Sequence, residues 1–290
     1  PYISNEYVLE YENDKCYMSF KGERKVEENN LSECEAVGLY FTSLDELKDM
    51  TYQETAYAVM KQFLELQPTA NQTFRLIGYG SRGNLASRLE QSYKAEQSGD
   101  YQTACQLRYE AFEDILSTLP DDEQSVVTLD RNHPNTLAAM ETMLASAVDN
   151  YLAGEGEMAA AQLELLLDCD DEDPLEATPV LALCYAMIGE WECLEDIDTD
   201  LGDKTALAPL LRALREYVTT GKIEGATMSQ LSRFKEFMTE LKRADHPTDD
   251  AYLGDISSER PSRAALAREL YLRAEPALAL YPDFLSELKS

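Results

Sequence analysis

The chain has 290 residues, of which 44% are hydrophobic, and it carries a formal net charge of −30 at pH 7. The hydrophobic content is high enough for a folded core, which excludes the class of intrinsically disordered proteins. The excess of acidic residues argues against nucleic acid as a partner, because that binding depends on Lys and Arg side chains that neutralise phosphates. It disfavours anionic membrane surfaces for the same reason. No run of about 18 apolar residues is present to form a transmembrane helix.

The acidic side chains are spread along the chain, so solubility explains the charge better than a basic partner, although both interpretations stay open. The cysteines are few and form no C-x-x-C pair: Cys16, Cys34, Cys105, Cys169, Cys184 and Cys193. Secreted disulfide scaffolds are shorter and richer in cysteine. We therefore expect reduced, mostly buried thiols in a cytoplasmic protein.

The first 45 residues are rich in strand formers. Tyr7–Tyr11 and Cys16–Phe20 predict two strands, and the polar residues Glu12–Lys15 suit the turn between them. Ala36–Phe41 predicts a third short strand. Because a lone hairpin is unstable in water, we expect this β-hairpin and loop segment, residues 1–45, to pack on the rest of the chain.

From residue 46 onward, apolar residues recur at helical spacing. The apolar positions between Ala56 and Leu66 predict a helix that ends at Pro68, and strands are expected only in the first 45 residues. Two further helices are predicted over Leu85–Gln97 and Tyr101–Leu119.

The middle of the chain carries clear helix-end signals. The apolar stripe Leu137–Tyr151 predicts a helix that ends in a left-handed cap at Gly154 or Gly156. Thr178 and Pro179 predict an N-cap followed by proline at the first helical position.

The last third also reads as helix. The predicted elements are helices over Leu207–Tyr217 and Met228–Leu241, a polar loop over Ala244–Ser258, and closing helices over Pro261–Ala279 and Pro282–Lys289.

One pattern recurs: a tyrosine near the end of a helix, a glycine turn, and a second helix. It occurs at Tyr93 with Gly99, Tyr151 with Gly156, Tyr185 with Gly189, and Tyr217 with Gly221. The last three glycines are 33 and 32 residues apart. A period in the thirties with two helices per unit is typical of an α-solenoid, in which stacked helix pairs bury a continuous core.

The segment Leu181–Trp191, with Ala182, Tyr185 and Gly189, resembles a unit of the tetratricopeptide repeat (TPR) family. The resemblance covers about residues 84–243 in degenerate form. It implies that the small residue lets paired helices approach, that the aromatic ring fills the gap between units, and that the glycine caps the first helix. It also implies a concave groove that holds an extended peptide or a partner helix. An irregular helical array is the alternative.

Gly78–Gly83 spells G-x-G-x-x-G after a short apolar run and before a predicted helix. Such a loop can bind a pyrophosphate at a helix N-terminus. A dinucleotide-binding unit also needs a second strand that ends in an acid about 20 residues later, and Asp100 lies there between two helices. We therefore interpret the loop as a glycine-rich turn, with nucleotide binding or catalysis as the alternative function.

Two acidic runs, Asp168–Asp173 and Asp196–Asp203, hint at calcium loops, but neither has glycine at the sixth position and glutamate at the twelfth. We expect solvated turns. The two histidines, His133 and His246, each precede proline and have no partners at the spacing of a metal site or a catalytic triad. Catalytic, metal-ligating and cofactor-binding residues are therefore predicted to be absent, and the chain is not expected to be an enzyme.

The sequence thus predicts a mainly α protein: stacked antiparallel helix pairs of a TPR-like α-solenoid over residues 46–290, with a small β-hairpin element over residues 1–45. The predicted function is a protein-interaction module, such as a scaffold, an adaptor or a chaperone-like protein, that binds a protein or peptide partner. A structural or regulatory subunit without a groove ligand is a further alternative.

The partner-binding residues are predicted from the exposed positions of the first helix in each pair. They are Glu141, Asp149, Arg212, Arg215 and Glu216. Because this set has mixed charge, we expect apolar anchors with a polar rim.

Overall fold

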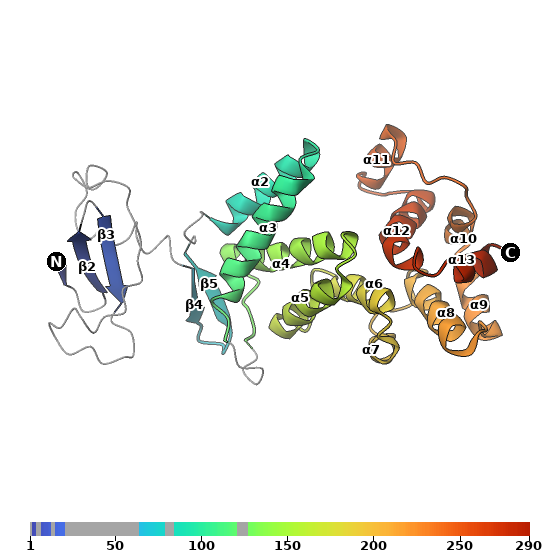
Figure 1. The fold of residues 1–290 in the computed structure, drawn as a ribbon, viewed down its shortest axis with the longest axis horizontal. Coiled ribbons are helices and arrows are strands. Elements are labelled where there is room, and N and C mark those ends of the chain that lie inside the picture. Colours follow the sequence, from blue (N-terminus) through green and yellow to red (C-terminus); the bar gives the residue numbers. More distant parts are fainter. Residues whose placement is uncertain (1, 4–6, 13–14, 21–63, 79–83, 121–126) are drawn as a thin grey trace. The chain divides into compact units, whose positions relative to one another are not determined.

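The computed structural model describes residues 2–3, 7–12, 15–20, 64–78, 84–120 and 127–290. Helices dominate this part of the chain, as predicted, and a small sheet lies near the N-terminus (Figure 1). The strand expected over Ala36–Phe41 and most of the helix expected over Ala56–Leu66 fall outside the described residues.

The N-terminal hairpin is confirmed. Strands β2 (Tyr7–Glu12) and β3 (Lys15–Phe20) pair antiparallel, with Glu12 opposite Lys15 at the turn. A short strand, β1 (Tyr2–Ile3), adds to the outer side of β2 and completes a three-stranded sheet in the order β1-β2-β3.

A second hairpin shows that the confinement of strands to the first 45 residues was wrong. Strands β4 (Glu65–Pro68) and β5 (Phe74–Ile77) pair antiparallel, with Leu66 opposite Leu76. Leu66 therefore belongs to a strand and does not close a helix. Pro68 ends the strand, a position where its missing N–H does no harm.

Strand β5 is tied to the start of helix α4 (Pro134–Leu152). The side chain of Thr136 accepts a hydrogen bond from the backbone N–H of Leu76 at 3.0 Å. The Asn135 side-chain amide donates to the carbonyl oxygens of Leu76 and Gly78 at 2.9 and 3.1 Å. Two consecutive side chains thus satisfy the strand's free backbone groups.

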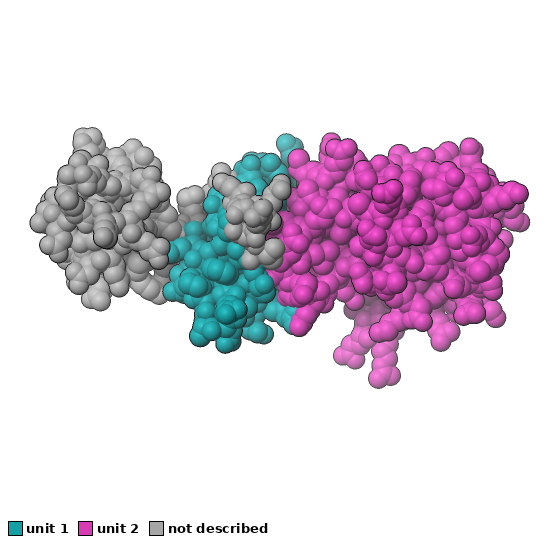
Figure 2. Space-filling view, turned by 90° about the horizontal axis from the view of Figure 1, so that it is seen from below, with its two compact units in different colours: residues 1–142 teal, residues 143–290 magenta. Residues whose placement is uncertain are grey.

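The chain divides into two compact units, residues 1–142 and 143–290, with the division inside α4 (Figure 2). In the first unit, α2 (Leu85–Gln97) packs against α3 (Tyr101–Leu116). The second unit holds α5 (Gly156–Cys169), α6 (Ala177–Ile188), α7 (Trp191–Asp196), α8 (Leu207–Thr220), α9 (Gly225–Leu231), α10 (Lys235–Leu241), α11 (Asp250–Ile256), α12 (Arg263–Leu278) and α13 (Pro282–Lys289). Sequence neighbours α5 and α6, and α8 and α9, pack as pairs, while α10 packs on α12.

Helix α6 lies at the centre of the second unit's core. Six consecutive residues, Leu181 to Ala186, are buried. A helix that is apolar on all sides is stable only when other elements surround it. Helices α5, α7, α8 and α12 all contact it.

The predicted start of α6 was wrong. The helix begins at Ala177, and Asp173 caps it: its carboxylate accepts hydrogen bonds from the backbone N–H groups of Ala177 and Thr178 at 2.6 and 2.9 Å. Pro179 lies within the first turn, where its missing N–H has no intrahelical acceptor to lose. The acidic turn before this helix therefore has a structural role.

The single helix predicted over Met228–Leu241 is also wrong, because the chain breaks between α9 and α10. Leu231 and Phe237 are both buried. Six residues in one straight helix would place them about 120° apart, so the break lets both side chains reach the core.

The polar stretch Ala244–Ser258, predicted as loop, contains α11. Asp249 caps this helix by accepting a hydrogen bond from the Tyr252 backbone N–H at 2.9 Å, and the Tyr252 side chain is buried. One aromatic anchor and one cap are enough for two turns, which is too little for a visible periodic pattern. Among the described residues, no helix has the length and apolar character to cross a membrane.

Candidate functional site

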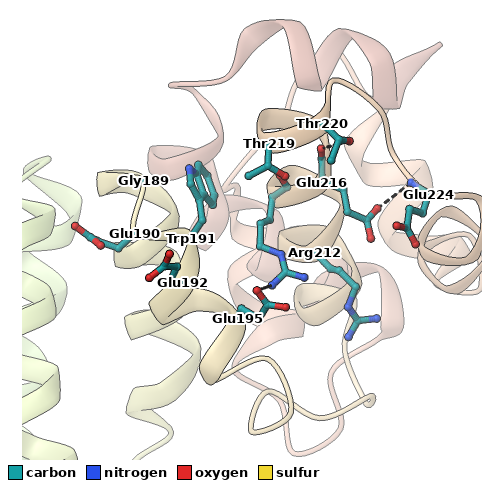
Figure 3. Close-up of a pocket in the computed structure, with 11 residues that line it drawn as sticks. Gly189, Glu190, Trp191, Glu192, Glu195, Arg212, Glu216, Thr219, Thr220 and Glu224 are labelled. Atoms are coloured by element: carbon teal, nitrogen blue, oxygen red, sulfur yellow. Dashed lines mark hydrogen bonds and ion pairs between the residues drawn. The ribbon is translucent and has the colours of Figure 1, made fainter.

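A pocket of about 780 Å³ opens in the second unit, between α7 and α8 (Figure 3). The glycine turn after α6, three residues of α7, one face of α8 and the residue before α9 supply its walls. The lining residues are Gly189, Glu190, Trp191, Glu192, Glu195, Arg212, Arg215, Glu216, Thr219, Thr220 and Glu224.

The glycine turn after α6 creates one wall. Gly189 has a φ of 77°, as predicted for a left-handed cap, and the chain turns at once into α7. Trp191 is the first residue of α7, and its indole ring meets the ring of Tyr281 edge-on with 5.8 Å between centroids. The Tyr281 hydroxyl donates to the carbonyl oxygen of Ala186 at 2.7 Å. This bond fixes the Tyr281 ring against which the Trp191 ring packs.

The two arginines of α8 are held by carboxylates of the same unit. Arg215 Nη1 lies 2.9 Å from Glu195 Oε2, and Arg212 Nη2 lies 2.6 Å from Asp198 Oδ2. Arg212 also donates to the side-chain oxygen of Gln230 at 2.6 Å. Both positive charges on the pocket wall are thus already neutralised.

Glu216 ties α8 to the start of α9. One carboxylate oxygen accepts a hydrogen bond from the Glu224 backbone N–H at 2.9 Å, and the other accepts from the buried Thr227 hydroxyl at 2.6 Å. The dashed line between Glu216 and Glu224 in Figure 3 marks the first of these bonds. Glu216 therefore positions the wall, and its charge is partly satisfied.

Three carboxylates of the lining have no such partner. Glu190, Glu192 and Glu224 are exposed, and the part of the chain that the structure describes places no cation beside them. Five glutamates and two arginines line the pocket in all. The pocket is therefore negative, with its excess charge on side chains that are free to bind.

The pocket contains three of the predicted partner-binding residues. Arg212, Arg215 and Glu216 line it, whereas Glu141 and Asp149 are half-buried on α4 and are not part of its lining. Sequence analysis missed Trp191 as a site residue. Its signal was available: the chain's sole tryptophan directly follows a glycine turn, where a large ring is unusual without a packing or binding role.

In the glycine-rich loop and the two acidic runs, the described residues Gly78, Asp173 and Asp198 bond to other parts of the chain. In the G-x-G-x-x-G loop only Gly78 is described, and its carbonyl accepts from Asn135. Asp173 caps α6 and Asp198 pairs with Arg212. In the described ranges, no three side chains of His, Cys, Asp or Glu come together as a metal site.

His246 belongs to a buried charge cluster between α10 and α12. Its Nδ1 lies 2.8 Å from Glu240 Oε1, and its ring stacks on Tyr271 with 3.8 Å between centroids. Arg268 donates to Glu240 at 2.8 and 3.3 Å. Burial raises the pKa of Glu240, but the hydrogen bonds from Arg268 and His246 outweigh it and hold the pKa below its usual value.

Two cysteines of the second unit are buried thiols. Burial raises the pKa of Cys169 and that of Cys184 each to about 12. A thiol attacks as the thiolate, so both are unreactive at neutral pH and serve as small apolar side chains.

Comparison of the chain with protein-family models, with curated proteins and with solved structures gives no match. The class that the fold defines is therefore a mainly helical protein whose helices pack in neighbouring pairs.

Proposed function

We propose that this protein is a protein-interaction module of TPR-like architecture, and that the pocket between α7 and α8 receives a segment of its partner. The observation that carries the proposal is the convergence of Arg212, Arg215 and Glu216, predicted as partner-binding, on one pocket with an aromatic wall. The left-handed glycines at the ends of α6 and α8, which recur 32 residues apart, support the repeat part of this proposal.

The pocket has the attributes of a recognition site. Its volume of about 780 Å³ lies in the range of sites that enclose a small ligand or a few side chains. Tryptophan and arginine are the residues most enriched where interfaces concentrate their binding energy. The hydrogen bonds of Glu216 and the ion pairs of the arginines preorganise the walls, which lowers the entropic cost of binding.

A blocked pocket tests the proposal. Thr219 lies on the exposed last turn of α8 in the pocket wall, and its hydroxyl bonds only the Arg215 carbonyl, one turn earlier. Thr219→Tyr therefore fills the pocket without changing its charge. Thr239→Tyr is the matched control, because Thr239 is an exposed helical threonine with the same bond to the carbonyl of Lys235 and lies outside the pocket.

Immobilised wild-type protein and both variants would be incubated with lysate of the source cells, and the captured proteins quantified by mass spectrometry. We expect at least one protein that the wild type and Thr239→Tyr retain and that Thr219→Tyr loses. If Thr219→Tyr captures the same proteins in the same amounts, the pocket is not the interaction site, and a structural subunit bound through another face becomes the better hypothesis.

A further inference from the structure

Given the proposed function, on which this inference rests, we infer that the segment bound between α7 and α8 is basic and places an arginine side chain against Trp191. Three independent features of the pocket support this: the pairing of its arginines, the free carboxylates of its lining, and the open aromatic wall.

An anionic segment does not fit the charges. Arg215 is paired with Glu195, and Arg212 with Asp198. A carboxylate or phosphate from a partner would have to displace one of these acids, which would then stand beside it as a like charge. Each arginine therefore already has a carboxylate partner in the wall, and an added anion would compete with that partner.

A cationic segment meets unpaired charge. Glu192 and Glu224 are exposed and have no ion-pair partner among the described residues, and Figure 3 shows them on opposite sides of the pocket, Glu192 below Trp191 and Glu224 beside Glu216. A guanidinium group can donate in-plane hydrogen bonds to two carboxylate oxygens and leave its face free for stacking. Arginine thus suits this wall better than a compact ammonium ion.

Trp191 offers the complementary aromatic surface. Trp191 is half-buried, and its ring contacts the Tyr281 ring at a steep angle of 61° with 5.8 Å between centroids. The cation–π contacts found among described residues involve Tyr93 and Tyr252, so no internal cation covers the Trp191 ring. Tryptophan is the best aromatic partner of a cation, and the contact strengthens as water is excluded.

The test uses intrinsic fluorescence, because Trp191 is the only tryptophan of the chain. The probe is an acetylated and amidated Gly-Arg-Gly-Arg-Gly peptide, titrated into the full chain at low ionic strength. The matched probe replaces both arginines by citrulline, which keeps the shape and removes the charge. We expect a saturable change in Trp191 emission with the arginine peptide and none with the citrulline peptide.

Paired variants separate pocket binding from general attraction to an acidic protein. Glu192→Gln/Glu224→Gln removes two charges from the pocket lining, and we expect the dissociation constant to rise about fivefold or more. Glu259→Gln/Glu287→Gln removes two exposed charges outside the pocket and is expected to leave it within about twofold. Circular dichroism confirms that all variants are folded.

The inference is overturned if the arginine peptide gives no saturable change, if both double variants weaken binding equally, or if citrulline binds as well as arginine. These outcomes differ from failure of the proposed function. Loss of a captured protein in Thr219→Tyr, without any effect of Glu192→Gln/Glu224→Gln on its capture, would keep the interaction module and reject the basic segment.

Discussion

Two helix pairs of similar shape are held together by different chemistry. Between α2 and α3, Arg88 and Arg108 are each 4% exposed, and they pair with Asp114 and Glu96 at 2.7 and 2.9 Å. The Arg108 guanidinium also lies over the Tyr93 ring. This helix pair therefore buries two arginines that depend on their carboxylate partners, beside apolar side chains such as Leu89 and Ile115.

Between α5 and α6 the seam is close and mainly apolar, with one polar link in which the Tyr185 hydroxyl donates to the Glu164 carboxylate at 2.6 Å. A Cβ atom at Gly156 would lie 2.7 Å from Ile188 Cγ2, so the first turn of α5 approaches α6 more closely than any other residue type permits. Ala159, Leu163 and Leu166 on α5 are all buried. Close apolar packing dominates here, so a helix pair can be stabilised mainly by apolar contacts or with the help of buried ion pairs.

The largest expected effect is on the charged seam. Asp114→Ala leaves the Arg88 guanidinium buried without its counter-charge, and the described residues already give its Nη2 no hydrogen-bond partner. We expect a loss of about 3 kcal/mol in the free energy of unfolding, measured by urea denaturation. Glu113→Ala, at the exposed neighbouring position, should cost less than about 0.5 kcal/mol.

A second substitution tests whether the unpaired charge of Arg88 causes this loss of stability. Arg88→Met combined with Asp114→Ala removes both charges, and the double variant should be more stable than Asp114→Ala alone. Equal stability of the two variants would show that packing, and not the unpaired charge, accounts for the loss.

Adding one methyl group between α5 and α6 should lower the free energy of unfolding. Gly156→Ala forces the new Cβ against Ile188 Cγ2, and we expect a loss of about 2 kcal/mol by urea denaturation. The control is Gly225→Ala, at the start of α9, where no atom lies within 4 Å of the new Cβ. There alanine should be neutral or stabilising, because it favours helix. A Gly156 variant as stable as its control would mean that the two helices separate without cost.

The turn that ends this pair is the next position to test. Gly189 has a φ of 77°, where a β-branched residue is strained, so Gly189→Val should lower the free energy of unfolding by about 1–2 kcal/mol. Gly189→Asn should cost less, since asparagine tolerates the left-handed region. Thermal melting that is the same for wild type and Gly189→Val would refute the turn geometry.

The smallest expected effect is on the pH dependence of stability. It tests whether the ion pair between α10 and α12 in the second unit stabilises the fold as the ion pairs between α2 and α3 do. The pKa of Glu240 lies below the ordinary glutamate value of 4.5, so its ion pair stabilises the fold above that pH. This stabilisation is lost as the pH falls through the folded-state pKa. Glu240→Gln should therefore flatten the acid side of the stability–pH curve below pH 4.5, while Glu236→Gln, at a more exposed position, should leave it steep. Parallel curves for wild type and Glu240→Gln would assign acid unfolding to other carboxylates.

Much of the fold could be read from local signals. The limits of α2 agree with the prediction, and Gly189 has its expected left-handed conformation. The prediction of one helix over Met228–Leu241 was wrong because its apolar positions fit a single helical period as well as they fit two short helices. Three residues of α8 that the helical pattern predicted as partner-binding line the pocket, whereas Trp191 was not predicted although its place after the glycine turn was visible in the sequence; its contact with Tyr281, 90 residues away, was not.

The helical class, the N-terminal hairpin and the glycine turns follow from local sequence, because hydrophobic period, strand propensity and the freedom of glycine act over a few residues. Which charged side chains lack a partner depends on packing between distant parts of the chain. In the sequence, Arg212, Arg215 and Glu192 all look like exposed charged side chains. In the structure, both arginines pair with carboxylates of neighbouring elements, whereas Glu192 has no cationic partner among the described residues. Pairing between side chains distant in sequence depends on packing, and it is this pairing that leaves the pocket negative.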